Sequence, residues 1–144
     1  MGADHGGVIL KDQLKDHLLK KGYEVVDVGT NGSLSVDYPD YAFVASEMVS
    51  KKEADRGVLI CSTGIGMSIA ANKVKGIRCA LTHDTTSARL TREHNNSNVI
   101  AMGAKIVDFE KAKEILDIWL TTEFTFGRHE RRVDKITKYE EERK

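Results

Sequence analysis

A cysteine followed directly by a glycine-rich turn is the most chemically suggestive feature of the sequence. The apolar run Val58–Ile60 ends at Cys61, the small-residue loop 62–66 follows, and residues 66–73 can form a helix. This order predicts a buried strand that delivers a thiol to its carboxyl end. Glycines let backbone N–H groups approach a ligand, and a helix N-terminus favours negative charge. A thiol beside such an anion-binding loop indicates a catalytic site.

Cys61 has two interpretations, a structural thiol or a catalytic base. Cysteine is among the most buried residue types, so a core position is a serious alternative. A free thiol has a reference pKa of about 8.5, and it becomes an effective base near a helix N-terminus or a cation. Backbone N–H groups of residues 62–66 could then stabilise an oxyanion. Cys79 lies inside a predicted strand with no glycine loop after it, and we expect it in the core.

Other polar residues could take part in the same chemistry. His94 lies in the polar run 92–96, where a surface histidine is the simpler reading, but histidine titrates closest to neutrality and suits proton transfer. Asp4 is either a helix N-cap or a carboxylate that orients an imidazole or binds hydroxyl groups. Arg128 and Arg132 are four residues apart and would share one helix face. They would bind a phosphate there, unless the helix is simply charged and solvated.

Composition indicates one domain over residues 1–144. The formal net charge is zero, which does not favour a nucleic-acid-binding protein. No apolar run approaches the roughly 20 residues of a membrane span, and residues 1–5 do not resemble a signal peptide. Two cysteines outside any CxxC pair favour a reduced, cytoplasmic protein. The histidines lack HxH or HExxH spacing and residues 64–66 lack a dinucleotide fingerprint, so we expect no metal ion and no nucleotide cofactor.

Apolar periodicity predicts strands and helices that alternate along the chain. Leu10, Leu14 and Leu18 mark the buried face of the first helix, and Asp108 is a plausible N-cap. Alternation implies parallel βαβ units with helices on both faces. We therefore expect an α/β fold, a single-domain Rossmann-like three-layer sandwich with a five-stranded parallel sheet. The expected strands are residues 1–3, 23–28, 57–61, 77–82 and 98–102, and the expected helices are residues 7–21, 39–49, 66–73, 85–93, 109–120 and about 128–143.

The expected fold also predicts where a ligand would bind. In open parallel sheets ligands bind beyond the carboxyl ends of the strands. That rule selects Asp4 and His5, the loop after Cys61, and the residues that follow Thr82 and Met102.

Five motifs, taken together, make the sequence recognisable. The motifs are Gly2-Ala3-Asp4-His5-Gly6-Gly7, Asp37-Tyr38-Pro39, Cys61-x-Thr63-Gly64-x-Gly66-x-Ser68-Ile69-Ala70-Ala71-Asn72-Lys73, Arg92-Glu93-His94-Asn95-x-x-Asn98 and Gly127-Arg128-His129-x-x-Arg132. They resemble those of the type B ribose-5-phosphate isomerases, a family that also includes the galactose-6-phosphate isomerase subunits. The resemblance runs in order from the first residue into the final helix.

The resemblance implies an aldose–ketose isomerase that interconverts D-ribose 5-phosphate and D-ribulose 5-phosphate through an enediolate, in the non-oxidative pentose phosphate pathway. It implies no metal and no cofactor. Cys61 would be the proton-abstracting base and His94 the ring-opening acid, with Thr63 and Asp4 beside them. Contacts with the sugar or the phosphate are implied for Asp4, His5, Tyr38, Ser62, Thr63, Gly64, Ile65, Gly66, Asn95, Lys105, Arg128 and Arg132.

The family's assembly is also implied, a homodimer or homotetramer whose active sites are shared between subunits. The mostly charged segment of about residues 126–144 would bury little on its own body, so we expect its helix to reach a partner subunit. It would carry Arg128 and Arg132 toward the partner's Cys61 loop. His129 and Arg131 project elsewhere on the turn, and we expect them to serve only solubility or a subunit contact.

Three departures from the family pattern keep rivals open. Ser62 stands where relatives usually have glycine, Lys105 replaces an arginine found in some relatives, and only Met1 to Ala3 precede the Asp4-His5 pair, so the first strand is clipped or the true start lies upstream. The nearest rival is an allose- or galactose-6-phosphate isomerase of the same family. A non-catalytic sugar-phosphate-binding module and a redox-sensing thiol protein are the rivals from other classes.

Overall fold

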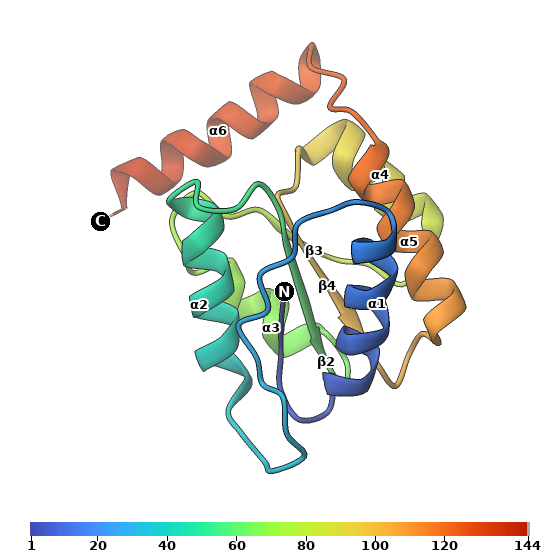
Figure 1. Cartoon of the computed structure of the whole chain (residues 1–144). Coiled ribbons are helices and arrows are strands. Elements are labelled where there is room, and N and C mark those ends of the chain that lie inside the picture. The colour runs from blue at the N-terminus through green and yellow to red at the C-terminus, as the bar shows by residue number, and fades with distance from the viewer. Residues whose placement is uncertain (144) are drawn as a thin grey trace.

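The computed structural model describes residues 1–143, so Lys144, the last residue of the expected helical segment, lies outside the described residues. Strands and helices alternate along most of the chain (Figure 1). The strands are β1 (Gly2–Ala3), β2 (Gly57–Cys61), β3 (Cys79–Leu81) and β4 (Val99–Gly103). The helices are α1 (Val8–Lys20), α2 (Tyr38–Ser50), α3 (Ile65–Ala71), α4 (Thr85–Asn95), α5 (Phe109–Thr121) and α6 (Arg128–Glu142).

Within residues 1–143 the sheet is parallel, has the order β1-β2-β4-β3, and has four strands rather than the five expected. The expectation of a strand at residues 23–28 is wrong. That segment does run beside β1, where Val28 N–H donates to the Met1 carbonyl at 2.9 Å and Ala3 N–H donates to the Gly29 carbonyl at 2.7 Å. Because β1 offers only two residues to pair with, these bonds do not extend into a regular ladder.

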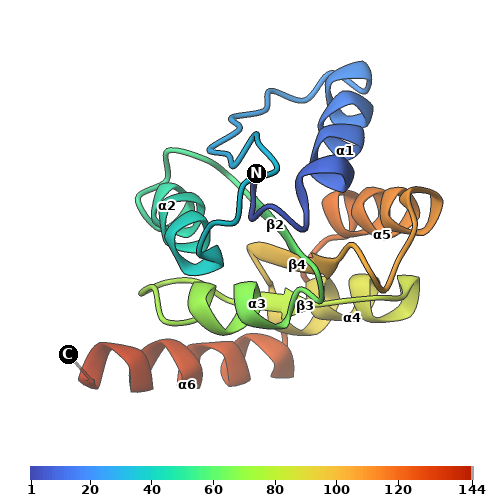
Figure 2. The same ribbon diagram turned by 90° about the horizontal axis from the view of Figure 1, so that it is seen from below.

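Alternating side chains of β2 and β4 divide the core into two halves. Val58, Ile60, Ile100 and Met102 face α1, α4 and α5, and they pack with the fully buried Trp119. Residues of the opposite parity, such as Leu59 and Val99, face α2 and α3. Period-two alternation in a strand sends successive residues to opposite faces, so each five-residue strand serves both layers of helices. Figure 2 shows these layers, with α6 lying outside α3 and α4.

Aspartate side chains cap the starts of α4 and α5, and a proline lies at the start of α2. The Asp108 carboxylate accepts the Lys111 N–H at 2.8 Å, which confirms the expected N-cap of α5. Asp84 caps α4 in the same way through Ser87 N–H at 2.6 Å. Pro39 sits in the first turn of α2, where a missing N–H leaves no bond unmade.

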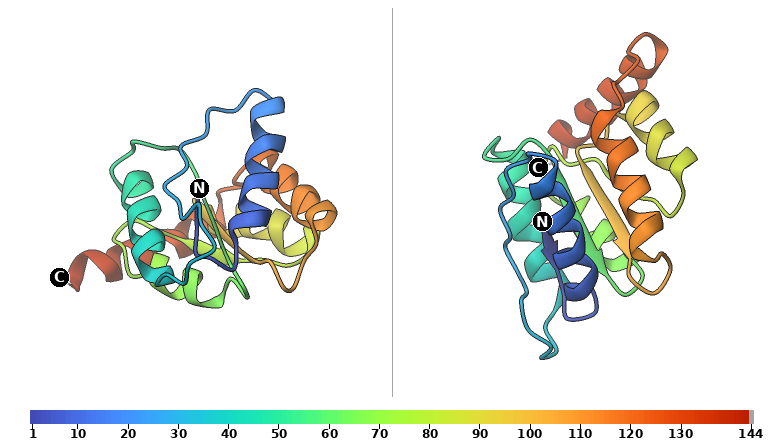
Figure 3. Two further views of the ribbon diagram at one scale, coloured as in Figure 1. Left: turned by 60° about the horizontal axis from the view of Figure 1, so that its bottom comes forward. Right: turned by 45° about the vertical axis from the view of Figure 1, so that its right-hand side comes forward.

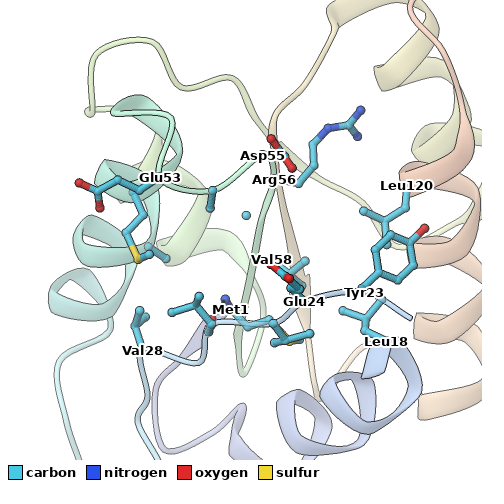
Figure 4. A pocket seen from close by; sticks show the side chains of 16 residues that line it. Met1, Leu18, Tyr23, Glu24, Val28, Glu53, Asp55, Arg56, Val58 and Leu120 are labelled. Carbon is cyan, nitrogen blue, oxygen red and sulfur yellow. Dashed lines mark hydrogen bonds between the residues drawn. The ribbon is translucent and has the colours of Figure 1, made fainter. Parts of the chain in front are cut away.

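A cavity of about 400 Å³ lies at the amino ends of the strands, between residues 23–28 and β2 (Figure 4). The Met1 ammonium lies in its wall and donates to the Val26 carbonyl at 2.7 Å. Burial lowers the pKa of this ammonium to about 6, although Asp27 opposes the shift. None of the helices in the described chain is long and apolar enough to cross a membrane.

Candidate active site

Cys61 ends β2 with its thiol held inside the glycine-rich loop. The side chain is 5% exposed, and the Gly64 N–H donates to its Sγ at 3.1 Å. Gly64 has φ of +76°, and an added Cβ would lie 2.7 Å from the Met102 carbonyl carbon. Only glycine fits this position, because a side chain would meet both the strained conformation and the neighbouring strand. The loop therefore aims a backbone donor at the sulfur, where it stabilises negative charge.

The rest of the loop is fastened to the segment after β4. Ala104 N–H donates to the Cys61 carbonyl and Lys105 N–H donates to the Ser62 carbonyl, both at 2.9 Å. Thr63 is exposed, and its hydroxyl accepts the Ile65 N–H at 3.3 Å. These bonds hold the loop at the carboxyl edge of the sheet and leave the Thr63 side chain facing outward.

Asp4 and His5 lie beside this loop, after β1. Asp4 N–H donates to the Ile60 carbonyl at 3.3 Å, and its carboxylate accepts the Gly6 N–H at 3.0 Å. His5 is exposed, and its Nδ1 accepts the Val36 N–H at 3.2 Å. An acceptor role for Nδ1 puts the proton of the neutral ring on Nε2.

Tyr38 packs on the Cys61 loop, and Ser62 within that loop points toward Asp4. A Cβ added at Gly66 would lie 2.5 Å from the Tyr38 ring, so this ring packs directly on the loop. A Cβ added at Gly6 would lie 2.4 Å from the Ser62 hydroxyl, so Ser62 points toward the Asp4 turn. The structure thus gathers Asp4, His5, Tyr38, residues 61–66 and the backbone of Lys105 at the carboxyl ends of the strands. We refer to this side of the sheet as the Cys61 edge.

His83 is a residue at this edge that the sequence motifs did not single out. It follows β3, and its Nε2 accepts the Gly103 N–H at 3.1 Å. Burial lowers the pKa of His83, although Asp84 opposes the shift. The only sequence signal was its place after Thr82, at the carboxyl end of a strand.

His94 and Asn95 lie near the amino ends of the strands, on the opposite side of the sheet from Cys61 in the same chain. We refer to this side as the His94 edge. Helix α4 starts after the carboxyl end of β3 and runs back, so that the Asn95 carbonyl accepts a bond at 3.0 Å from Arg78, which precedes β3. The five-residue strands β2 and β4 separate the two edges by roughly 13 Å. The right panel of Figure 3 shows the end of α4 and α6 above, and the loops of the Cys61 edge below.

The start of α6 joins His94 at this second edge. The rings of His94 and His129 are stacked with centroids 4.2 Å apart and an angle of 13° between their planes. The pKa of His129 is lowered by burial and then by the nearby charges of His94, Arg128 and Arg132. His129 therefore has a stacking partner in its own chain, which the expectation of a role only in solubility or a subunit contact did not include. The spacing of residues along α6 predicts the direction of His129 only relative to its sequence neighbours, whereas its stacking partner, His94, belongs to α4.

Cys79 is half buried against the core between α2 and α3, and burial raises the pKa of its thiol to about 12. Within residues 1–143, no three His, Cys, Asp or Glu side chains gather in a group that could hold a metal ion.

Known proteins are similar to this chain in sequence and in fold. A sequence model described as ribose/galactose isomerase matches residues 1–136. Ribose-5-phosphate isomerase B of Escherichia coli is 47% identical over 142 residues, which cover 99% of this chain and 95% of the relative.

Two solved structures extend the comparison to three dimensions. Ribose-5-phosphate isomerase B of Clostridium thermocellum has a TM-score of 0.98 at 50% identity, over 99% of this chain and 97% of its own. The Mycoplasma genitalium ribose-5-phosphate isomerase B, solved with bound ribulose-5-phosphate, has a TM-score of 0.95 at 43% identity, over 98% and 94% of the two chains. The α/β fold with a parallel sheet is therefore shared with these enzymes.

Proposed function

The chain belongs to the ribose/galactose isomerase family, and on that premise we propose that it interconverts D-ribose 5-phosphate and D-ribulose 5-phosphate. It is an isomerase, as its relatives are. The observation that carries the assignment is the Cys61 thiol at the carboxyl end of β2, which accepts the Gly64 N–H and lies in a loop bordered by Asp4 and Tyr38. The two free cysteines support a reducing, cytoplasmic location.

Cys61 acts as the base of an enediolate mechanism. In the open-chain aldose its thiolate removes the proton from C2, and the electron pair moves to the C1 carbonyl oxygen. The thiol returns the proton to the enediolate at C1, while the proton of the C2 hydroxyl passes to the C1 oxygen, so that C2 becomes the ketone and C1 carries the hydroxyl group. N–H groups of residues 62–66 are donors for the developing oxyanion, and loss of one such donor typically costs about 3 kcal/mol of barrier stabilisation. Thr63 and Asp4 assist through hydrogen bonds with the reacting oxygens.

The substrate-binding residues belong to the two edges of the sheet. Asp4, His5, Tyr38, Ser62, Gly64, Ile65, Gly66 and Lys105 hold the sugar at the Cys61 edge. His94 and Asn95, with the guanidinium groups of Arg128 and Arg132, form the other half of the site. His94 opens the sugar ring, and the two arginines hold the phosphate.

We further propose that each working site combines the Cys61 edge of one subunit with the His94 edge of another. Support comes from the separation of the two edges by the length of β2 and β4, because one sugar phosphate cannot contact Cys61 and His94 of the same chain across the sheet. Helix α6 supports the same arrangement. It buries only Val133, while Ile136 and Tyr139 are more than half exposed. The assembly is a homodimer, or a homotetramer built from such dimers.

The first test is removal of the thiol. Cys61→Ser should lower conversion of ribose 5-phosphate by about 100- to 10,000-fold, the range typical of a positioned general base. Cys79→Ser is the matched control and should retain wild-type activity. Allose and galactose 6-phosphates assayed in parallel would define the substrate. Full activity in Cys61→Ser would reject the base assignment, and wild-type protein without activity on any of the three would reject the enzyme.

The shared site is tested with mixed subunits. Cys61→Ala and His94→Asn proteins, each inactive alone, are unfolded, mixed in equal amounts and refolded. Random pairing should restore roughly a quarter of wild-type activity, because half of the dimers are hybrid and each hybrid has one complete site. A mixture of Cys61→Ala with Cys61→Ser is the control and should stay inactive. Confirmed hybrids without activity would place Cys61 and His94 in one chain.

A further inference from the structure

The His94 ring does not stand alone at its edge of the sheet. It is half buried, and the parallel ring of His129 covers one of its faces at a centroid distance of 4.2 Å. Stacking uses the face of an imidazole. The two nitrogens of His94 lie on the ring edge and stay available for proton transfer.

The backbone leading into α6 is fixed to the last turn of α4. The Glu93 carbonyl accepts two hydrogen bonds from Thr125, one from its N–H at 3.1 Å and one from its hydroxyl at 2.8 Å. The chain then turns sharply, with φ of +59° at Phe126 and +60° at Gly127, and α6 begins one residue later. His129 N–H donates to the Phe126 carbonyl at 3.1 Å. The position of His129 over His94 is therefore set by bonds on both sides of the turn.

A second set of bonds holds the residues that follow His94. The guanidinium of Arg92 is buried, and its Nη1 donates to the Ser97 carbonyl at 2.6 Å and to the Asn96 side chain at 2.9 Å. Its Nε donates to the Thr122 carbonyl at 3.2 Å. The Arg92 guanidinium thus binds both the end of α4 and the start of the segment leading to α6. These bonds fix the backbone on both sides of the histidine pair.

From this geometry we infer that His129 is a positioning residue for ring opening, which it serves by stacking on His94. The inference rests on the proposed isomerase function. In ring opening, His94 takes the proton from the anomeric hydroxyl and delivers a proton to the ring oxygen as the bond from C1 to that oxygen breaks. The products are the C1 aldehyde and a free hydroxyl. Both transfers occur in the plane of the imidazole, so a ring that tilts loses alignment with both oxygens.

Two substitutions separate stacking from other roles of His129. His129→Ala removes the stack, whereas His129→Phe keeps an aromatic ring over His94. Arg131→Ala, an exposed neighbour on α6, is the matched control. Misplacement of a reacting group by about 1 Å can lower a rate by about 100-fold. We expect His129→Ala to lower kcat for ribose 5-phosphate by about 10- to 100-fold with KM little changed, and His129→Phe to recover most of it.

The decisive readout uses the ketose, which has no ring to open. Wild-type enzyme in deuterated water should exchange a C1 proton of ribulose 5-phosphate, a reaction that requires Cys61 and the loop but not His94. This exchange, followed by NMR, should stay near the wild-type rate in His129→Ala. Unchanged conversion in His129→Ala, or parallel loss of conversion and exchange in both His129 variants, would overturn the inference. Wild-type protein with neither conversion nor exchange would instead reject the proposed function itself.

Discussion

At the scale of single residues, Lys11 is a charged side chain whose burial the sequence pattern does not predict. It lies on the face of α1 that the leucine spacing leaves polar, yet it is fully buried. Its ammonium donates to both carboxylate oxygens of Asp27, at 2.7 and 2.8 Å, and to the Thr30 carbonyl at 2.9 Å. Those partners lie 16 to 19 residues away in an irregular segment, where no periodicity could reveal them.

Removal of one member of this ion pair should destabilise the protein strongly. Lys11→Met leaves the Asp27 carboxylate without its main partner, and the free energy of unfolding should fall by about 3–5 kcal/mol. The double variant Lys11→Met/Asp27→Asn removes both charges and should recover part of that loss. Urea unfolding followed by circular dichroism measures both. Equal stability of Lys11→Met and the wild type would show that the pair contributes nothing.

The Lys11–Asp27 pair should also make the stability of the protein depend on pH. Burial tends to raise the pKa of Asp27, but hydrogen bonds from Lys11 and from the Gly29 N–H outweigh it and lower the pKa overall. A lowered carboxyl pKa contributes stability at neutral pH that disappears as the pH falls through the folded-state value. The stability difference between wild type and Asp27→Asn should therefore shrink below about pH 4. Urea unfolding from pH 7 to pH 3 measures it, and a constant difference would contradict the assignment.

At the scale of elements, helices and strands that depend on local sequence patterns could be predicted. Elements that depend on pairing with a distant segment could not. The helices near residues 39–49 and 109–120 and the strand 57–61 are confirmed, because their apolar spacing and caps are local signals. The strand at residues 23–28 was wrong because its regularity depends on β1. The Cys61 loop could be predicted as one stretch of sequence. The location of His94 could not, because it depends on the direction in which α4 crosses the sheet.

The turn between β2 and α3 should tolerate no side chain at Gly64. Gly64→Ala combines a positive φ with a Cβ that would lie 2.7 Å from the Met102 backbone, so the loop must move away from Cys61. We expect a loss of stability of about 1–3 kcal/mol and a fall in kcat of at least about 10-fold. Gly32→Ala, where nothing lies within 4 Å of the added Cβ, should leave both unchanged. Thermal unfolding and steady-state kinetics provide the measurements.

At the scale of the whole molecule, the two-edged arrangement makes activity depend on association. If each site needs two chains, specific activity should fall when the protein is diluted below the dissociation constant of the dimer. The fall should coincide with the appearance of monomer in analytical ultracentrifugation. Arg132→Ala should lower activity without moving that midpoint if it only binds phosphate. Activity that stays constant while monomer accumulates would show that one chain holds a complete site.

The distance between Cys61 and His94 along β2 and β4 also has a genetic consequence on the proposed arrangement. The thiol and the imidazole of one site are contributed by different polypeptides, so selection on a duplicated gene can act on each half separately. One copy can lose the cysteine and the other the histidine, and the pair still builds one complete site in each mixed dimer. Divergence of paralogues into an obligate two-gene enzyme then requires only two inactivating substitutions and no new catalytic residue.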